Sequence, residues 1–251
     1  MRQAGMKIVG IIGGMGPLAT VDLYRKIIEL TPATSDQEHL HVIIDANPAI
    51  PDRTAALLYG GPDPVPAIVE SARRLEQAGA DVLVMPCHTA HAFLPAITDA
   101  VAIPLISMVD ETVAAVRLVA PGEPVGILAT EGTIAVGLYQ HALGAIGRAT
   151  RTPPVDVQQR VTAVIAAVKA GRITPAIQTA VITAASELVR QGAGVIVAAC
   201  TELPLVLSQE HLGVPFIDPT RALAAAAVRV AREADAGEPA ETRVGVRGVE
   251  P

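Results

Sequence analysis

Short apolar runs alternate with longer segments of helical periodicity along almost the whole chain. Runs that are apolar at nearly every position are typical of parallel strands buried on both faces, and the segments between them are long enough for crossover helices. We expect strands at residues 7–12, 41–44, 81–85, 103–107, 124–128, 194–198 and 214–217. The pattern therefore predicts an α/β fold built on mostly parallel sheets.

Start and stop signals mark two of the expected helices. Residues 66–78 begin with Pro66 in the first turn and end just before Gly79, and residues 155–170 end just before Gly171. Proline at the start and glycine just past the end are the usual limits of a helix. Residues 47–66 instead hold five prolines and two glycines with little periodicity, which predicts a long loop. Such a loop inside a compact domain is usually functional.

A weak internal repeat divides the chain into two halves. A strand that runs into Gly13 is followed by one that runs into Cys87, and a strand that runs into Thr130 is followed, at similar spacing, by one that runs into Cys200. We expect two pseudo-symmetric lobes, formed by residues 6–105 plus 212–236 and by residues 106–211, with a flexible tail over residues 237–251. The two cysteines, each at the carboxyl end of a strand, would then lie on opposite walls of a cleft between the lobes.

Composition narrows the function classes. Hydrophobic residues make up 51% of the 251 residues and charged ones 18%, which excludes a disordered chain. A net charge of -6, with only three Tyr, two Phe and no Trp, disfavours nucleic acid as a partner. We find neither an apolar run of membrane-spanning length nor an amino-terminal leader pattern, so we predict a cytoplasmic protein with no membrane partner.

Cys87 and Cys200 are the only cysteines, so no disulfide framework holds the fold together. A thiol where a strand opens into a helix is favoured as thiolate, and Thr89 and Thr201 fit the start of such helices. Two thiols at matching points of two half-repeats suit removal and return of a proton on opposite faces of one carbon. The alternative for either cysteine is simple packing, because free Cys is often buried.

Other residues offer weaker signals. Cys87, His88 and His91 could ligate a metal, but the sequence has no CxxC pair and no second His or Cys cluster, so we expect no metal site. His91 would follow Cys87 by one helical turn and would orient the thiol or merely pack. The glycines at residues 13–16 let backbone approach a ligand carboxylate. Arg53 offers a guanidinium to a carboxylate, or is a solvated loop residue paired with Asp52.

Five ordered motifs resemble those of the pyridoxal-independent aspartate/glutamate racemases, most closely the aspartate racemases, over about residues 7–234. They are Gly13-Gly14-Met15-Gly16-Pro17, Ile50-Pro51-Asp52-Arg53-Thr54, Met85-Pro86-Cys87-His88-Thr89-Ala90-His91, Leu128-Ala129-Thr130-Glu131-Gly132-Thr133 and Cys200-Thr201-Glu202-Leu203. The resemblance implies two α/β lobes, a homodimer, no metal or cofactor, and a small amino-acid substrate, with a dicarboxylic one favoured.

By motif position, the resemblance makes Cys87 and Cys200 the catalytic pair that interconverts L- and D-aspartate or glutamate. It makes Arg53 a ligand of a substrate carboxylate and brings Lys169, which could equally be a helix-end charge, to the side-chain end. Thr89, Thr130 and Thr201 would hold the α-carboxylate and amine. The full set of expected substrate-binding residues is Met15, Arg53, His88, Thr89, Thr130, Thr133, Lys169, Thr201 and Glu202.

Two positions depart from the family pattern, since His88 stands where Asn is usual and Ala199 where Gly is usual. An imidazole at residue 88 is larger than an amide and can carry charge near neutral pH, although an imidazole buried in a cleft tends to lose its proton. Two alternatives therefore stay open: a non-catalytic amino-acid sensor, and a decarboxylase or cis-trans isomerase of the same fold.

Overall fold

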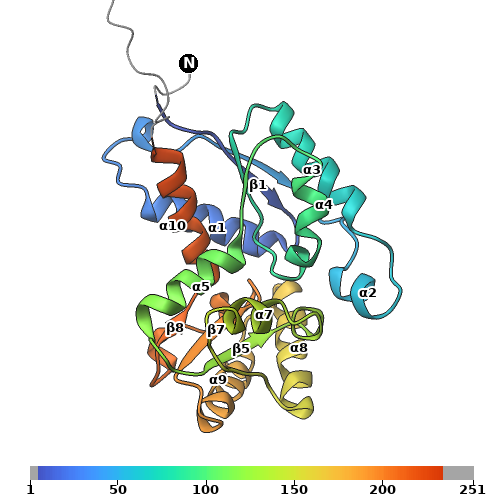
Figure 1. Ribbon diagram of the computed structural model, residues 1–251, viewed down its shortest axis with the longest axis vertical. Coiled ribbons are helices and arrows are strands. Elements are labelled where there is room, and N and C mark those ends of the chain that lie inside the picture. Colours follow the sequence, from blue (N-terminus) through green and yellow to red (C-terminus); the bar gives the residue numbers. More distant parts are fainter. Residues whose placement is uncertain (1–4, 234–251) are drawn as a thin grey trace, which may run out of the picture.

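The computed structural model describes residues 5–233, which form two α/β lobes placed one above the other (Figure 1). The first sheet has the strand order β2 (Val42–Ala46), β1 (Val9–Gly13), β3 (Val82–Val84) and β4 (Leu105–Ile106), with every neighbouring pair parallel. The expected tail at residues 237–251 lies outside the described residues.

The second sheet repeats the first. Its order is β6 (Thr150–Arg151), β5 (Val125–Ala129), β7 (Val195–Ala199) and β8 (Phe216–Ile217), again with every neighbouring pair parallel. In each half the first strand in sequence pairs with the second and the third, and the third pairs with the fourth. The prediction of an α/β fold with two pseudo-symmetric lobes is confirmed.

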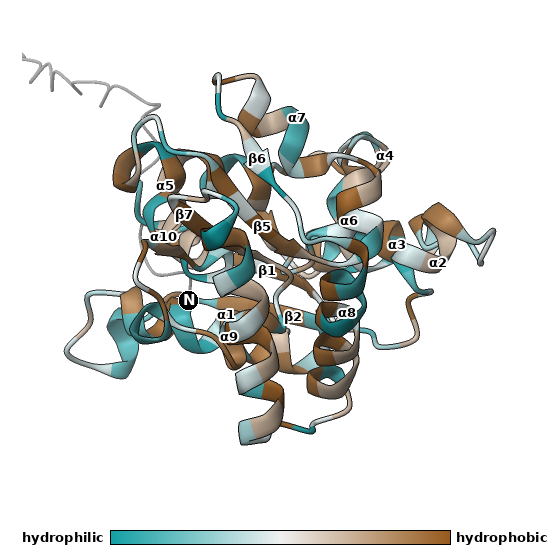
Figure 2. Cartoon of the chain, turned by 90° about the horizontal axis from the view of Figure 1, so that it is seen from below, coloured by the Kyte–Doolittle hydropathy of each residue, from teal (hydrophilic) through white to brown (hydrophobic). Residues whose placement is uncertain are grey.

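Helices cover both faces of each sheet, which explains why the central strands β1, β3, β5 and β7 are apolar and buried at every position. In the first lobe, α1 (Pro17–Leu30) and α10 (Pro219–Arg232) pack on one face, and α3 (Val65–Gln77) and α4 (Leu94–Thr98) on the other. In the second lobe, α8 (Val155–Lys169) and α9 (Pro175–Arg190) pack on one face, and α5 (Met108–Val119) and α7 (Leu138–Gly144) on the other. Figure 2 shows the apolar strands enclosed between these helices.

The chain passes between the lobes twice. The first passage runs from β4 into α5, and the second from β8 into α10, which packs against both α1 and α5. Because β8 pairs with β7, the second sheet extends to Ile217, past the boundary that we expected at residue 212. The last helix of the described residues, α10, is therefore part of the first lobe (Figure 1).

A buried ion cluster fastens this last helix to the first. Lys26 of α1 is only 5% exposed, and its Nζ lies 2.5 Å from Asp22 Oδ2 and 2.6 Å from Asp218 Oδ2. The other oxygen of Asp218 caps α10 by accepting from the backbone amides of Thr220 and Arg221. Two carboxylates thus share one ammonium where the chain returns to the first lobe.

Two details differ from the prediction. The two-residue strand β6 was not predicted, and it is too short for a periodic signal. The long loop over residues 47–66 is interrupted by helix α2 (Arg53–Leu58), which Asp52 caps by accepting from the Ala55 amide at 2.7 Å. The prediction of a continuous loop is therefore wrong for this six-residue stretch. The remaining elements are α6 (Glu131–Ala135) and the 3₁₀ turns η1 (Asp36–Glu38), η2 (Thr89–Phe93), η3 (Leu203–Leu205) and η4 (Gln209–His211).

Candidate active site

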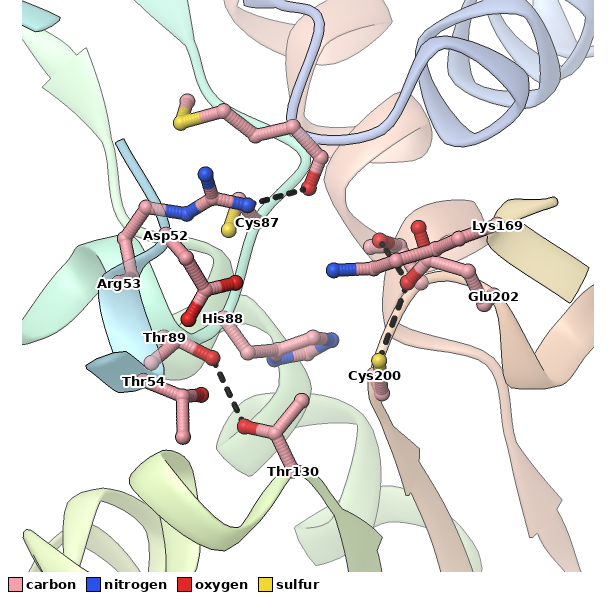
Figure 3. A pocket seen from close by; sticks show the side chains of 12 residues that line it. Asp52, Arg53, Thr54, Cys87, His88, Thr89, Thr130, Lys169, Cys200 and Glu202 are labelled. Atoms are coloured by element: carbon pink, nitrogen blue, oxygen red, sulfur yellow. Dashed lines mark hydrogen bonds between the residues drawn. The ribbon is translucent and has the colours of Figure 1, made fainter. Parts of the chain in front are cut away.

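A pocket lies where the carboxyl ends of the central strands of both lobes meet (Figure 3). Ligands of open parallel sheets bind at this edge, next to the point where the strand order reverses. In both lobes that point lies between the first and third strands, β1 and β3 or β5 and β7. The lining residues are Met15, Asp52, Arg53, Thr54, Cys87, His88, Thr89, Thr130, Lys169, Cys200, Thr201 and Glu202.

The pocket contains both expected catalytic cysteines and every expected substrate-binding residue except Thr133, whereas the glycines at residues 13–16 and His91 do not line it. Thr133 lies behind the lining and accepts a hydrogen bond from Thr130 at 3.0 Å, while its oxygen is 2.9 Å from Thr89 Oγ1. Thr89 and Thr130 are themselves 2.9 Å apart. The three hydroxyls form a closed triangle that joins the end of β3 in one lobe to the end of β5 in the other.

Cys87 lies in the turn after β3, where its backbone amide donates to Met85 O at 2.8 Å. His91 fixes this turn because its Nε2 accepts from the Met108 amide at 3.1 Å, which leaves Nδ1 protonated to donate to Cys87 O at 2.8 Å. Burial lowers the pKa of His91, in keeping with this neutral form. His91 therefore holds the Cys87 backbone and not its thiol.

The turns after the two cysteines are shorter than we expected. Thr89 begins the five-residue 3₁₀ helix η2, which runs directly into the short helix α4, and Thr201 precedes η3 without belonging to a helix. Thr201 instead donates from its hydroxyl to Pro86 O at 3.2 Å, which links the end of β7 to the turn that carries Cys87. Long helices with a strong dipole do not start at either thiol.

Cys200 is held as a thiol by Glu202. Its Sγ–H donates to Glu202 Oε2 at 3.1 Å, and Glu202 is itself only 2% exposed. Burial raises the pKa of Cys200 well above its ordinary value, the charge of Glu202 raises it further, and Lys169 opposes both. A methyl group on Gly16 would lie 3.0 Å from Glu202 Oε1, so the glycine leaves room for this carboxylate.

Lys169, the last residue of α8, extends its ammonium into the pocket (Figure 3). Burial acts to lower the pKa of Lys169, but Glu202, Cys200 and Cys87 together outweigh it and the pKa is raised. The side chain is therefore an ammonium that faces both thiols. This placement favours a functional interpretation of Lys169 over a simple helix-end charge.

Arg53 is buried, with 7% of its surface exposed, and is not the solvated partner of Asp52. Its Nη1 donates to Ile50 O and Pro51 O, and its Nη2 donates to Met15 O at 3.3 Å. A guanidinium has five N–H groups, so one on Nη2 and the one on Nε remain, and Nε is buried without a partner among the described residues. Two neighbouring donors of this kind suit a carboxylate.

His88 is 2% exposed and lines the pocket beside Cys87. Its Nδ1 lies 2.8 Å from the hydroxyl of Tyr139, which donates to Thr112 Oγ1 at 3.2 Å, and Thr112 in turn donates to Met108 O at 2.6 Å. Burial, with a smaller contribution from His91, holds the pKa of His88 well below its ordinary value. The imidazole is therefore neutral.

Four residues around the site were not predicted. Asp52 and Thr54 line the pocket and flank Arg53 in a motif that the sequence analysis had singled out, so their position was a usable signal. Tyr139 and Thr112 support His88 from the second lobe, and no pattern in the sequence marks them. Among residues 5–233 no group of three or more His, Cys, Asp or Glu side chains could hold a metal ion.

Comparison with known proteins adds a family to this geometry. A family model described as Asp/Glu/hydantoin racemase matches residues 12–227. The chain is 31% identical over 227 residues to a Bacillus subtilis protein named broad specificity amino-acid racemase RacX, with 88% of this chain and 96% of that protein covered.

Solved structures give the same picture. The aspartate racemase of Picrophilus torridus superposes with a TM-score of 0.79 at 32% identity, covering 90% of this chain and 94% of that one. The glutamate racemase isoform RacE1 of Bacillus anthracis superposes with a TM-score of 0.67 at 21% identity, covering 93% of this chain and 85% of that one. At that identity the second likeness concerns the fold alone.

Proposed function

The chain belongs to the Asp/Glu/hydantoin racemase family, and we propose that it interconverts L- and D-aspartate, or glutamate, by proton transfer between Cys87 and Cys200. Membership makes it an amino-acid racemase, which is an isomerase. The proposed reaction uses neither pyridoxal nor a metal ion. Its substrate and its pair of bases are the parts that experiment has to test.

The observation that carries the proposal is the matched placement of the two thiols. Cys87 follows β3 and Cys200 follows β7, which are equivalent strands of the two lobes, and both side chains line one pocket. A substrate held between them would present one face of its Cα to each sulfur. That arrangement suits a reaction in which a proton leaves one face and another arrives on the opposite face.

In the proposed reaction one cysteine acts as thiolate and the other as thiol. The thiolate takes the Cα proton, and the electron pair of the broken C–H bond moves into the α-carboxylate to give an enediolate. The second thiol then gives its proton to the opposite face of Cα, and the configuration is inverted. Each turnover leaves the first cysteine protonated and the second ionised, ready for the reverse direction.

The Cα–H of an amino acid is a very weak acid, so the site has to stabilise the enediolate. Thr89, Thr130 and Thr201 line the pocket with hydroxyls, and the Lys169 ammonium faces the thiols. Thr201 donates to Pro86 O and Thr130 to Thr133 before a substrate binds, so these hydroxyls would turn from those acceptors to the substrate carboxylate. Fixed donors in a pocket that excludes water are worth more than the same donors in water. We assign the α-carboxylate to this group.

The hydrogen bond from Cys200 to Glu202 suggests where the proton of the Cys200 thiol goes when Cys200 ionises. A thiol whose pKa is raised by burial is a reluctant base, and a neighbouring carboxylate offers its proton a place to go. When Cys200 is the residue that removes the Cα proton, Glu202 would first accept the proton of the Cys200 thiol. In the other direction Cys200 is already the protonated acid that the reaction needs.

For the substrate side chain we assign the distal carboxylate to Arg53. Three backbone carbonyls hold its guanidinium in place, and the donors that remain suit a carboxylate. The Lys169 ammonium would also interact with the side-chain carboxylate of the substrate. Aspartate and glutamate therefore fit better than an amino acid with a neutral side chain.

The protein is further proposed to act as a homodimer. Helix α1 exposes an apolar stripe formed by Leu18, Val21, Tyr24 and Ile28, which are at least 38% exposed. Apolar side chains in such a row are typical of a surface that another chain covers. A cytoplasmic location stays a prediction. No helix within residues 5–233 is long and apolar enough to span a membrane.

The direct test is incubation of enantiopure L-aspartate and L-glutamate, with neutral amino acids alongside, followed by chiral chromatography. We expect D-aspartate or D-glutamate to appear, and to be lost in Cys200→Ala. Tight binding without any D-enantiomer would instead favour a sensor. Loss of total amino acid, in place of inversion, would favour a decarboxylase.

A further inference from the structure

His88 is the pocket residue whose hydrogen bonds are left incomplete. Its Nε2 is buried and has no hydrogen-bond partner among the described residues, although the side chain lines the pocket. Figure 3 shows the imidazole reaching across the pocket from the turn that carries Cys87. A buried polar atom without a partner is costly, so its retention points to a partner supplied by a ligand.

The hydrogen bonds behind His88 determine what this nitrogen can offer. The Thr112 hydroxyl proton is used on Met108 O at 2.6 Å, so Thr112 accepts from Tyr139. The Tyr139 proton is thereby used, and its oxygen can only accept from His88 at 2.8 Å. His88 Nδ1 therefore carries the ring proton, and in the neutral ring Nε2 is a lone-pair acceptor.

We propose that His88 Nε2 accepts a hydrogen bond from the α-ammonium of the substrate, and that Tyr139 and Thr112 are positioning residues that keep this nitrogen unprotonated. The proposal rests on the proposed function in that the ligand is an amino acid. Both carboxylates of a dicarboxylic amino acid offer only acceptors, so its ammonium is the group that an unprotonated Nε2 can bind.

The position of His88 next to Cys87 indicates that the partner of its Nε2 is the ammonium on Cα and not a group farther along the substrate. His88 directly follows Cys87, whose sulfur has to reach Cα in the proposed reaction, and the ammonium is attached to Cα. The cationic ends of the pocket, Arg53 and Lys169, are suited to carboxylates and not to an ammonium. A neutral acceptor beside the reacting carbon completes the set of contacts that a zwitterion needs.

Paired ligands test this assignment without requiring turnover. Succinate is aspartate without the α-amino group, so binding of each to the full-length protein is measured by calorimetry for the wild type, His88→Leu and His88→Gln. A hydrogen bond to a charged group predicts that His88→Leu weakens L-aspartate about 10- to 100-fold. We expect the affinity for succinate to change less than about twofold in His88→Leu, a small fraction of the effect on L-aspartate. His88→Gln, which keeps an acceptor at a similar reach, should recover much of the loss.

Tyr139→Phe tests the positioning residues. It removes the acceptor from His88 Nδ1 and frees the ring to exchange tautomers, whereas Tyr59→Phe, at a 69% exposed tyrosine outside the pocket lining, is the matched control. Nitrogen NMR of the His88 ring should show an unprotonated Nε2 in the wild type and in Tyr59→Phe, and a mixture of tautomers in Tyr139→Phe. L-Aspartate should bind more weakly to Tyr139→Phe alone, and succinate should not.

Equal losses for aspartate and succinate, or a protonated Nε2 in the wild type, would overturn the proposal. Either result could occur in an active racemase, so it would leave the proposed function standing. Failure to racemise any amino acid would remove the proposed function, while the comparison of aspartate with succinate would still report whether His88 binds an ammonium.

Discussion

The thiol of Cys200 donates a hydrogen bond to the buried carboxylate of Glu202 across 3.1 Å. Burial and this carboxylate both raise the pKa of the thiol, while Lys169 lowers it. One cysteine of the pair is therefore held in its protonated form by a neighbour in its own lobe.

Replacing Glu202 by Gln should lower the pKa of Cys200, because the negative charge that disfavours the thiolate is gone. The rate of alkylation of Cys200 against pH, measured in a Cys87→Ser background, should move to lower pH. Glu210→Gln, at an exposed carboxylate, is the control and should leave the curve in place. A curve that stays fixed or moves to higher pH in Glu202→Gln would contradict this account of the thiol.

Lys169→Met should shift the alkylation curve of Cys200 in the opposite direction in the same assay. Loss of the ammonium removes the charge that favours the Cys200 thiolate, so the alkylation curve should move to higher pH. Shifts of the same sign in both variants would indicate a general disturbance of the pocket and not the electrostatics described above.

Cys87→Ala and Cys200→Ala should each abolish racemisation while the fold stays intact. General acid–base catalysis contributes roughly 10²–10⁴-fold, and each direction of the proposed reaction needs both thiols. Turnover is measured from each enantiomer, with thermal unfolding as the check on folding. A variant that retains more than about a tenth of wild-type turnover is incompatible with two-base catalysis.

Arg53→Lys should weaken the use of aspartate more than that of alanine. Arginine offers two parallel donors to a carboxylate and lysine one point charge, and a hydrogen bond to a charged group is worth about 1.5–3 kcal/mol. Lysine is preferred to alanine as the replacement because Arg53 also holds three backbone carbonyls. The measurement is kcat/KM for both amino acids, and an equal loss for both would mean that Arg53 does not read the side chain.

Lys26→Met should destabilise the protein without entering the chemistry. It leaves Asp218 without its ammonium and Asp22 with only the exposed guanidinium of Arg25, and removing one member of a buried ion pair costs about 3–5 kcal/mol. Arg160→Met removes one member of an exposed pair and should cost at most about 1 kcal/mol. Denaturant unfolding of the two variants makes the comparison, and similar losses would contradict it.

Much of the fold follows from the sequence because its central strands are buried on both faces. All seven predicted strands are present, and their limits differ from the prediction by a few residues. β6 was not predicted because two residues carry no periodicity. α2 was not predicted because it lies among prolines, where Asp52 caps it locally. The predicted boundary at residue 212, where the chain was expected to return to the first lobe, lies before β8. The pairing of β8 with β7 depends on contacts distant in the sequence, which the local pattern does not reveal.

The candidate site was predictable wherever its residues follow a strand directly. Cys87, Thr130 and Cys200 could be located because parallel strands bring their carboxyl ends together. The hydrogen bonds that support His88 could not be predicted, because Tyr139 and Thr112 come from two helices of the other lobe. The sequences of those helices mark the two residues only as buried positions. That Arg53 is buried and held by backbone carbonyls also required the folded loop.

The central claim is that two cysteines exchange protons with opposite faces of Cα, and turnover of L-aspartate in D₂O tests it most directly. At low conversion, chiral chromatography coupled to mass spectrometry gives the deuterium content of each enantiomer separately. We predict that the D-aspartate formed carries deuterium at Cα while the remaining L-aspartate does not, because the product receives its proton from a thiol that exchanges with solvent. Deuterium appearing equally in both enantiomers from the start would mean that a single base serves both faces, and would contradict the account.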